Sequence, residues 1–169
     1  MARKMDKNSD TDAAAAFWTF ALTFYARPGI APLCLRLQAE GGTDVMALIA
    51  HCHATARQDS PLSATELAAL RDHMAEWHRR AVLPLRALRV DLRDPVAHLP
   101  DARRESFRDQ LKQLELAAEK VQAGMIADWL ARRNPADGGD FTQGLRLLAG
   151  PAALPDPDIA LLREAAKPA

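Results

Sequence analysis

Cysteine is scarce in this sequence, and its scarcity excludes one class of protein. The chain of 169 residues holds only two cysteines, Cys34 and Cys52. Two thiols cannot build the multi-disulfide framework of a small secreted domain. Each lies in an apolar helical pattern, where a free thiol behaves as a small hydrophobic group. We therefore expect two core thiols in a protein of the reducing cytoplasm.

Net charge is absent altogether. Lys and Arg number 22, Asp and Glu also number 22, and the formal net charge is zero. Such a chain lacks the positive field that draws a protein to a polyanion, so nucleic acid is disfavoured as the main partner. Hydrophobic residues make up 49% and charged residues 26%, a balance typical of a globular domain.

Long hydrophobic runs are also missing. No segment reaches the about 18 uncharged apolar residues that a membrane-spanning helix needs. Arg27 and Arg36 interrupt the longest candidate. The opening MARKMDKNSDTD carries both signs of charge and runs into a short apolar block without the small-residue cleavage site of a signal peptide. We expect no membrane partner.

Strand patterns and phosphate or nucleophile motifs do not occur either. Without a Gly-rich loop or a serine in a strand–turn–helix elbow, nucleotide hydrolysis and acyl transfer have no support. Helical periodicity instead predicts an all-α, single-domain bundle. We predict a disordered N-terminal tail over residues 1–11, the helical bundle over 12–150, and a Pro-rich linker with a short terminal helix over 151–169.

The first predicted helix carries most of the few aromatic residues. It begins at a cap at Thr11 or Asp12 and ends near Ala26, before the turn residues Pro28 and Gly29. Five of the nine aromatic residues lie on it: Phe17, Trp18, Phe20, Phe24 and Tyr25. A helix that is apolar around most of its girth is typical of a core, so we interpret the cluster as core, with one edge left to line a pocket.

Capping signals mark the next helices. A second helix ends at Gly41 and Gly42, and Thr43 is an N-cap candidate for the third, with the negative charge of Asp44 beside it. Ser63-Ala-Thr-Glu66 has the pattern of a capping box and predicts the start of the fourth helix.

Proline and a heptad-like pattern shape the two longest helices. The apolar stripe of the fourth helix continues past Pro84, which should kink it. The fifth helix is long, and its apolar residues alternate in steps of four and three: Phe107, Leu111, Leu114, Ala118, Val121 and Met125. Two short C-terminal helices follow.

Histidines and cysteines give no catalytic or metal site. His51 and His53 lie two apart on a helix, so their side chains point to opposite sides and cannot bind one metal ion. We expect His53 to be half-buried at the edge of the apolar face and His51 to point outward. Nothing in the local sequence places the side chain of an activating base beside either thiol, although His51 and His53 flank Cys52 along the chain. We assign no catalytic residue, no metal and no cofactor.

An arginine row on the fourth helix is the polar feature of most interest. Arg79, Arg86, Arg89 and Arg93 are spaced to share one face, which suits the carboxylates or phosphates of a partner protein. The alternative is a solvated face whose arginines pair with acids of the long helix. The acids considered are Glu105, Asp109, Glu115 and Glu119.

A pocket between the first three helices is the second candidate site. Tyr25, Asp44 and His53 are the residues expected to line it, because helix bundles place sites between helices and a buried Asp near a His tunes proton transfer.

The order of several motifs resembles an uncharacterised bacterial family of helical proteins, a domain-of-unknown-function family. The motifs are FW at 17–18, YARPG at 25–29, CLRLQ at 34–38, GTDV at 42–45, Trp77 and PLRALR at 84–89. The resemblance covers residues 16 to about 130 and implies a cytoplasmic helical protein without carrying over any catalytic residue. One departure is Met46, where the family pattern has a polar residue.

Two functions remain open at this stage. The first is a non-enzymatic protein-interaction or regulatory module that uses the arginine row. The alternative is a small-molecule-binding protein, or an enzyme, with the pocket of Tyr25, Asp44 and His53.

Overall fold

The computed structural model describes residues 7–135 and 138–167, and confirms the all-α prediction within them. A kinked helix and a long helix dominate the molecule, as expected. The elements, in chain order, are α1 (Lys7–Tyr25), α2 (Ile30–Gly41), α3 (Val45–Gln58), α4 (Ala64–Trp77), the π-helical turn η1 (His78–Val82), α5 (Leu83–Asp91), α6 (Asp101–Arg132), α7 (Phe141–Ala149) and α8 (Asp156–Ala166).

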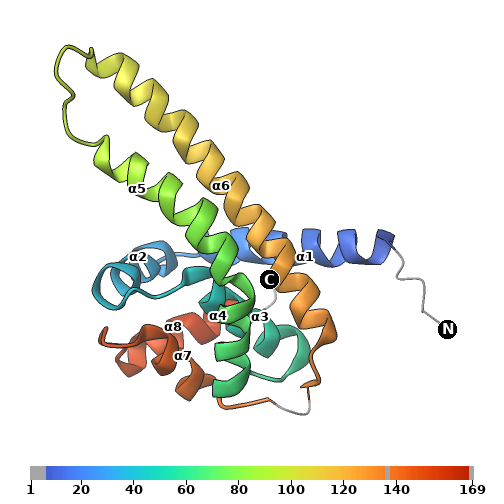
Figure 1. Ribbon diagram of the computed structural model, residues 1–169. Coiled ribbons are helices and arrows are strands. Elements are labelled where there is room, and N and C mark those ends of the chain that lie inside the picture. Colours follow the sequence, from blue (N-terminus) through green and yellow to red (C-terminus); the bar gives the residue numbers. More distant parts are fainter. Residues whose placement is uncertain (1–6, 136–137, 168–169) are drawn as a thin grey trace.

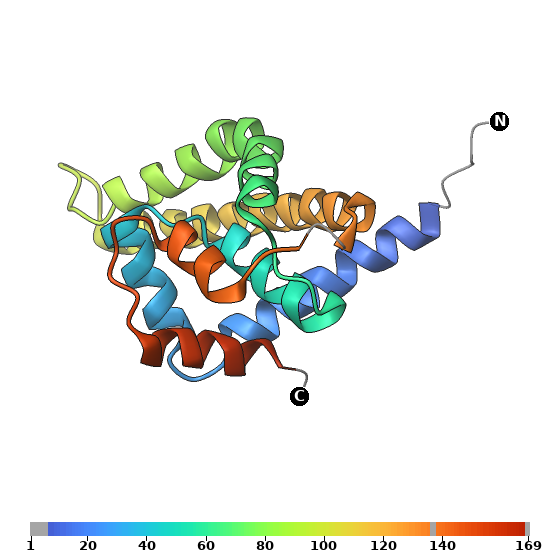
Figure 2. The same ribbon diagram turned by 90° about the horizontal axis from the view of Figure 1, so that it is seen from below.

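The helices form a body and a projecting hairpin (Figure 1). The body contains α2, α3, α4, α7 and α8, while α5 and the first half of α6 extend from it side by side (Figures 1 and 2). α1 packs along α6 and continues beyond the body in another direction (Figures 1 and 2). The base of the hairpin therefore lies where α1, α5 and α6 meet.

Local capping chemistry sets the helix boundaries that the sequence predicted. Ser63 and Glu66 form the capping box: the Ser63 backbone N–H donates to Glu66 Oε2 at 2.9 Å, and the Glu66 N–H donates to Ser63 Oγ at 3.3 Å. Gly42 ends α2 with a φ of 65°, a left-handed conformation that suits glycine. Asp140 caps α7.

The cap of α3 corrects one expectation. Asp44, and not Thr43, is the N-cap residue, because its Oδ1 accepts from the Met46 N–H at 3.0 Å and from the Ala47 N–H at 3.2 Å. The carboxylate thus satisfies two of the amides that a helix start leaves free, where its charge also complements the helix dipole.

The expected kink takes the form of a π-helical turn. η1 joins α4 to α5, and Pro84 is the second residue of α5. Proline has no N–H to donate to the preceding turn, and a wider turn before it accommodates the missing bond. The extra residue in this turn also shifts the register of every side chain that follows it.

The described structure adds detail at the two ends of the chain. α1 begins at Lys7, about a turn earlier than the expected cap, so residues 7–11 of the predicted tail are helical; residues 1–6 lie outside the described residues. At the other end, Ile159 and Leu162 of α8 are buried in the same core as the rest of the body. The short terminal helix expected in this region is α8, and it packs into the core of the body.

The interior confirms the core role of both cysteines and of three aromatic residues. Cys34 and Cys52 are free and fully buried, and burial raises the pKa of both thiols, that of Cys34 to about 12. Phe17, Phe20 and Phe24 are buried in the same cluster. No helix in the described part of the chain has the length and hydrophobicity to cross a bilayer.

His51 is the clearest error of the sequence interpretation. Its ring is fully buried, whereas we expected it to point outward. The Leu62 N–H donates to Nδ1 at 3.2 Å, so Nε2 carries the proton and donates to the Phe141 carbonyl at 3.0 Å. The expectation assumed that other helices cover only the apolar face of α3. In the structure α7 and α8 cover the other side as well.

Candidate functional site

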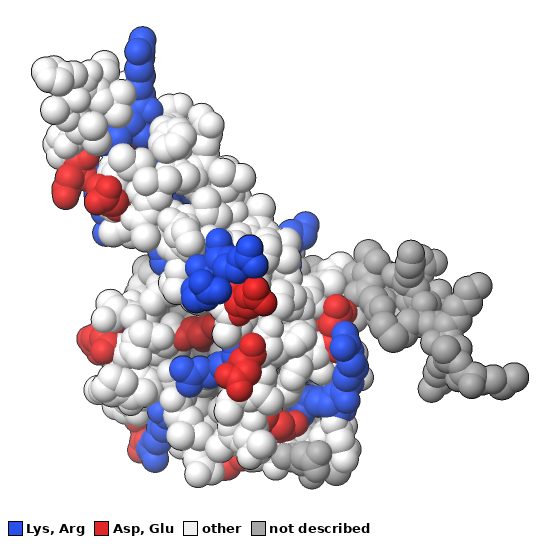
Figure 3. Space-filling view, in the orientation of Figure 1, with Lys and Arg blue, Asp and Glu red and all other residues white. Residues whose placement is uncertain are grey.

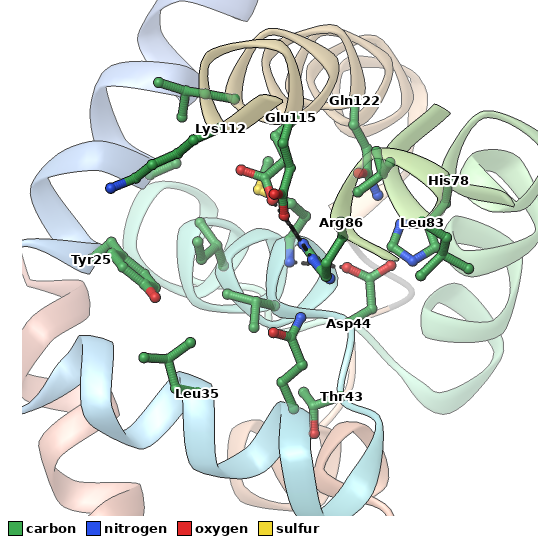
Figure 4. A pocket seen from close by; sticks show the side chains of 18 of the residues that line it. Tyr25, Leu35, Thr43, Asp44, His78, Leu83, Arg86, Lys112, Glu115 and Gln122 are labelled. Carbon is green, nitrogen blue, oxygen red and sulfur yellow. Dashed lines mark hydrogen bonds and ion pairs between the residues drawn. The ribbon is translucent and has the colours of Figure 1, made fainter. Parts of the chain in front are cut away.

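A pocket of about 720 Å³ opens at the base of the hairpin (Figure 4). α1, α2 and the start of α3 form one side, as the pocket hypothesis expected. The other side comes from η1, α5 and α6, which that hypothesis did not include. Tyr25 and Asp44 therefore share a pocket with Arg86 and Arg89, so the structure joins parts of two sites that the sequence kept separate.

Ion pairs between α5 and α6 form the polar part of the pocket. Arg86 Nε donates to Glu115 Oε1 at 2.8 Å, and Arg86 Nη2 donates to Glu119 Oε1 at 2.9 Å. Arg89 Nε donates to Glu115 Oε2 at 2.6 Å. In Figure 4 the Arg86 and Glu115 side chains point toward each other across the pocket. Glu115 is the central acceptor, because both arginines converge on it.

The two glutamates respond differently to this setting. Burial alone would raise the pKa of Glu115, but the hydrogen bonds from Arg89 and Arg86 outweigh it, and the pKa is lowered. Glu119 receives only one guanidinium bond. Its pKa is raised, because burial and the nearby Glu115 carboxylate together outweigh the attraction of Arg86.

Apolar side chains form the walls of the pocket. Several are well exposed for large hydrophobic residues, including Leu35 at 58% and Leu83 at 44%. Tyr25 and Trp18, the half-buried edge of the aromatic cluster, complete this wall. Burial raises the pKa of the Tyr25 hydroxyl, and Cys34 and Glu119 add to the effect. The hydroxyl is therefore neutral at pH 7 and available to donate a hydrogen bond.

Three polar atoms of residues that line the pocket are buried without a hydrogen-bond partner in the described structure. They are Thr43 Oγ1, His78 Nδ1 and Gln122 Oε1. Gln122 is 1% exposed, and its amide donates to the Met74 sulfur at 3.3 Å, a weak acceptor. Buried polar groups are ordinarily paired, so these three atoms can form hydrogen bonds to water or to a ligand in the pocket.

The arginine row does not form one surface. Arg86 and Arg89 point toward the long helix and pair with Glu115 and Glu119, whereas Arg79 and Arg93 are exposed and line no part of the pocket. Arg79 lies within the π-helical turn, which breaks the regular spacing, and Arg93 lies beyond the end of α5. Glu105 pairs instead with Arg104 and Arg108 of its own helix.

His53 lies apart from the pocket. Its ring meets Phe17 edge-on at a centroid distance of 5.1 Å and Phe20 at 4.8 Å. Burial lowers its pKa to about 4, and Arg57 adds to the shift. It is thus half-buried, as expected, but it supports the core and contributes nothing to the pocket.

The free energy of unfolding is expected to fall as the pH drops from about 7 to about 5. In this window the unfolded chain protonates His53 near its ordinary pKa of 6.5, while the folded chain, with a pKa of about 4, does not. This stability is fully present above about pH 6.5, and about 2 kcal/mol of it is lost by about pH 5. Urea unfolding at several pH values measures the loss.

His53→Phe provides the control, since it keeps a ring against Phe17 and Phe20 and removes the titrating group. Its pH dependence should be visibly flatter, although His51, whose pKa burial also lowers, still titrates. Equal slopes for the variant and the original protein would contradict the assignment.

Sequence motifs did not predict some of the residues that line the pocket. Gln122 lies on the long helix without any motif, and Lys112 is one charge among many there. Leu35 had a weak signal, because it falls outside the apolar stripe of its helix. Within the described residues, no three His, Cys, Asp or Glu side chains are placed to share a metal ion.

Residues 16–126 match the family described as "Protein of unknown function (DUF2390)". This range confirms the resemblance that the motif order indicated. It includes most of the elements that form the pocket, from α1 to the pocket-lining turns of α6. No curated protein and no solved structure matches the sequence.

Proposed function

Since the chain belongs to the DUF2390 family, we propose a function from the pocket itself: non-enzymatic binding of a small molecule with an apolar body and a short polar end. The observation that carries the proposal is the ion-paired group of Arg86, Glu115, Arg89 and Glu119, held at fixed distances between apolar walls. The volume of about 720 Å³ falls in the range of small-molecule sites, about 300–1,000 Å³.

The charges of the pocket favour a neutral or zwitterionic ligand. Three cations line it, Arg86, Arg89 and Lys112, and three acids balance them: Asp44, Glu115 and Glu119. A polyanion such as a nucleotide would find no excess of positive charge. Polar groups remain available for a ligand, because Lys112 forms no ion pair with a described residue and Gln122 Oε1 has no donor. Affinity should therefore depend only weakly on salt.

A substitution at the pocket wall tests the proposal. Leu35→Trp places a larger side chain at an exposed position, so it should narrow the pocket without unfolding the protein. The probe is N-phenyl-1-naphthylamine, an uncharged dye with an apolar body and one polar N–H group, followed by its fluorescence. We expect saturable binding to the original protein and at least a tenfold weaker binding to Leu35→Trp.

Leu147→Trp is the matched control. Leu147 is similarly exposed, at 49%, but lies on α7 away from this pocket. Its binding curve should equal that of the original protein. Equal binding by all three proteins would contradict the pocket as the site. As a separate measurement, native mass spectrometry of the gently purified protein would identify a natural ligand by its added mass.

A partner protein that uses the arginine row is the second candidate, and its basis is narrower. The charges of Arg86 and Arg89 already have acidic partners. Arg79 and Arg93 are exposed and form no ion pair with any described residue, so they would carry such an interaction. Replacing both by Glu, with Arg71→Glu as an exposed control, separates this candidate from pocket binding, which the two changes should leave intact.

A further inference from the structure

The long helix α6 has an apolar row that nothing in the described chain covers. Phe107, Leu114 and Val121 are seven residues apart and so lie on one side of the helix. Their exposed fractions are 48%, 55% and 50%. Three half-exposed large side chains in a line on one helix are unusual for an isolated protein, because each leaves apolar surface in water.

This row is one half of a heptad seam. The four- and three-residue steps of the sequence alternate between this row and a second row of Leu111 and Ala118. These two residues are buried, at 4% and 7% exposed, beneath α5 and the adjoining end of α4, where Trp77 Nε1 donates to the Ala118 carbonyl, and Met125, which continues their series, is half-buried. A heptad pattern ordinarily buries both rows, so the hairpin supplies a partner for only one of them.

Gly124 of the same helix lies beside the apolar row and faces open space. A Cβ added at Gly124 would meet nothing within 4 Å, so no contact within the described structure requires a glycine there. Glycine inside a helix costs about 1 kcal/mol relative to alanine. Gly124 and Ala117 each follow a member of the apolar row by three residues and provide a small-residue strip beside it, where a second helix can approach closely.

Charges at the ends of the row are complementary to each other. Asp128 continues the seven-residue series after Val121, and Arg103 lies one turn before Phe107. Neither forms an ion pair with a described residue. In an antiparallel pair of α6 helices centred near Leu114, Arg103 of one copy lies within about one turn of Asp128 of the other. The same pairing then occurs twice, as a twofold axis requires.

We infer that the row of Phe107, Leu114 and Val121 is a self-association surface, on which a second copy of this chain packs its own α6 in the antiparallel direction. This inference is independent of the pocket, whose lining includes none of the three residues. The first half of α6 projects from the body, so a second copy can reach that part of the row (Figure 1), and Val121, in the second half, is itself 50% exposed. On the face shown in Figure 3, the middle of the hairpin is largely uncharged, with charges toward its tip and base.

The dimensions of the surface predict a weak dimer. From Arg103 to Asp128 the helix is about 37 Å long, and a strip about 11 Å wide gives about 400 Å² per copy. Stable complexes bury about 800 Å² per partner, so α6 alone supplies about half of that. We therefore expect a dissociation constant in the micromolar range and not an obligate dimer.

Sedimentation velocity of the full chain from about 1 to about 500 µM tests the inference. The original protein should shift from its monomer mass of 18.5 kDa to twice that value as the concentration rises. Leu114→Glu should weaken the association at least tenfold. Leu147→Glu, an exposed leucine on α7, should leave it unchanged. Thermal melts of both variants at low concentration show that each monomer remains folded.

Charge exchange distinguishes a second copy from any other occupant. Arg103→Asp or Asp128→Arg alone should weaken self-association, and the two together should restore it, because each copy then offers the reversed pair. A protein that stays monomeric up to about 500 µM would overturn the inference. Association that Leu114→Glu leaves intact, or that the double exchange fails to restore, would overturn this packing of α6.

Discussion

Replacing Glu115 by alanine is expected to lower the free energy of unfolding by about 3 kcal/mol. Glu115 has 8% of its side chain exposed and accepts hydrogen bonds from both Arg86 and Arg89. Its removal leaves two partly buried guanidinium groups without their central partner. Breaking a buried ion pair costs about 3–5 kcal/mol, and the lower end applies because these arginines are nearly a quarter exposed.

Glu119→Gln is the matched comparison on the same helix. The raised pKa of Glu119 means that the fold disfavours its charged form, and glutamine removes that charge while its oxygen still accepts from Arg86 Nη2. At pH 7 the free energy of unfolding of the variant should therefore lie within about 1 kcal/mol of that of the original protein. Urea unfolding of both variants measures the difference; equal losses would contradict the central role given to Glu115.

Glu115→Ala also changes the charge of the pocket. Glu115→Ala changes the formal charge of the pocket-lining residues from zero to plus one, because Arg86, Arg89 and Lys112 remain. An anionic dye such as 8-anilinonaphthalene-1-sulfonate should then bind more tightly to Glu115→Ala than to the original protein, although the variant is less stable. Opposite effects on stability and binding would show that the ion pairs hold the hairpin base together and also neutralise the site.

Local chemistry explains the parts of the fold that could be predicted from sequence. The Ser63–Glu66 capping box, the left-handed Gly42 and the Asp140 cap each depend on residues within a few positions of one another. Such capping patterns set the ends of a helix regardless of which other helices it packs against. The acids that receive Arg86 and Arg89 were also among those considered, since Glu115 and Glu119 are one turn apart and match the spacing of the two arginines.

Long-range packing explains the parts that could not be predicted. The pocket needs α1 to meet α6, and these helices are distant in sequence. His51 is buried because α7 and α8 cover a side of α3 that a helical wheel shows as polar. The π-helical turn changes the register of the arginine row, and no residue pattern before Pro84 indicates an extra residue in that turn.

Replacing His51 by alanine is expected to lower the free energy of unfolding by about 4 kcal/mol. The ring joins three segments: it lies on α3, accepts from the Leu62 N–H and donates to the Phe141 carbonyl. Alanine leaves both backbone groups buried and unpaired, each at a cost of about 1–3 kcal/mol, and adds a cavity. His73→Ala, at an exposed histidine of α4, should change the value by less than about 0.5 kcal/mol.

Gly144, on α7, packs directly against the His51 ring. A Cβ there would lie 2.3 Å from His51 Cε1, so Gly144→Ala should destabilise the protein by about 1–2 kcal/mol, even though alanine favours a helix by about 1 kcal/mol. In the double variant the small side chain at position 51 removes the clash. The double variant should therefore be at least as stable as His51→Ala alone, and strictly additive losses in urea unfolding would contradict the packing of Gly144 against the ring.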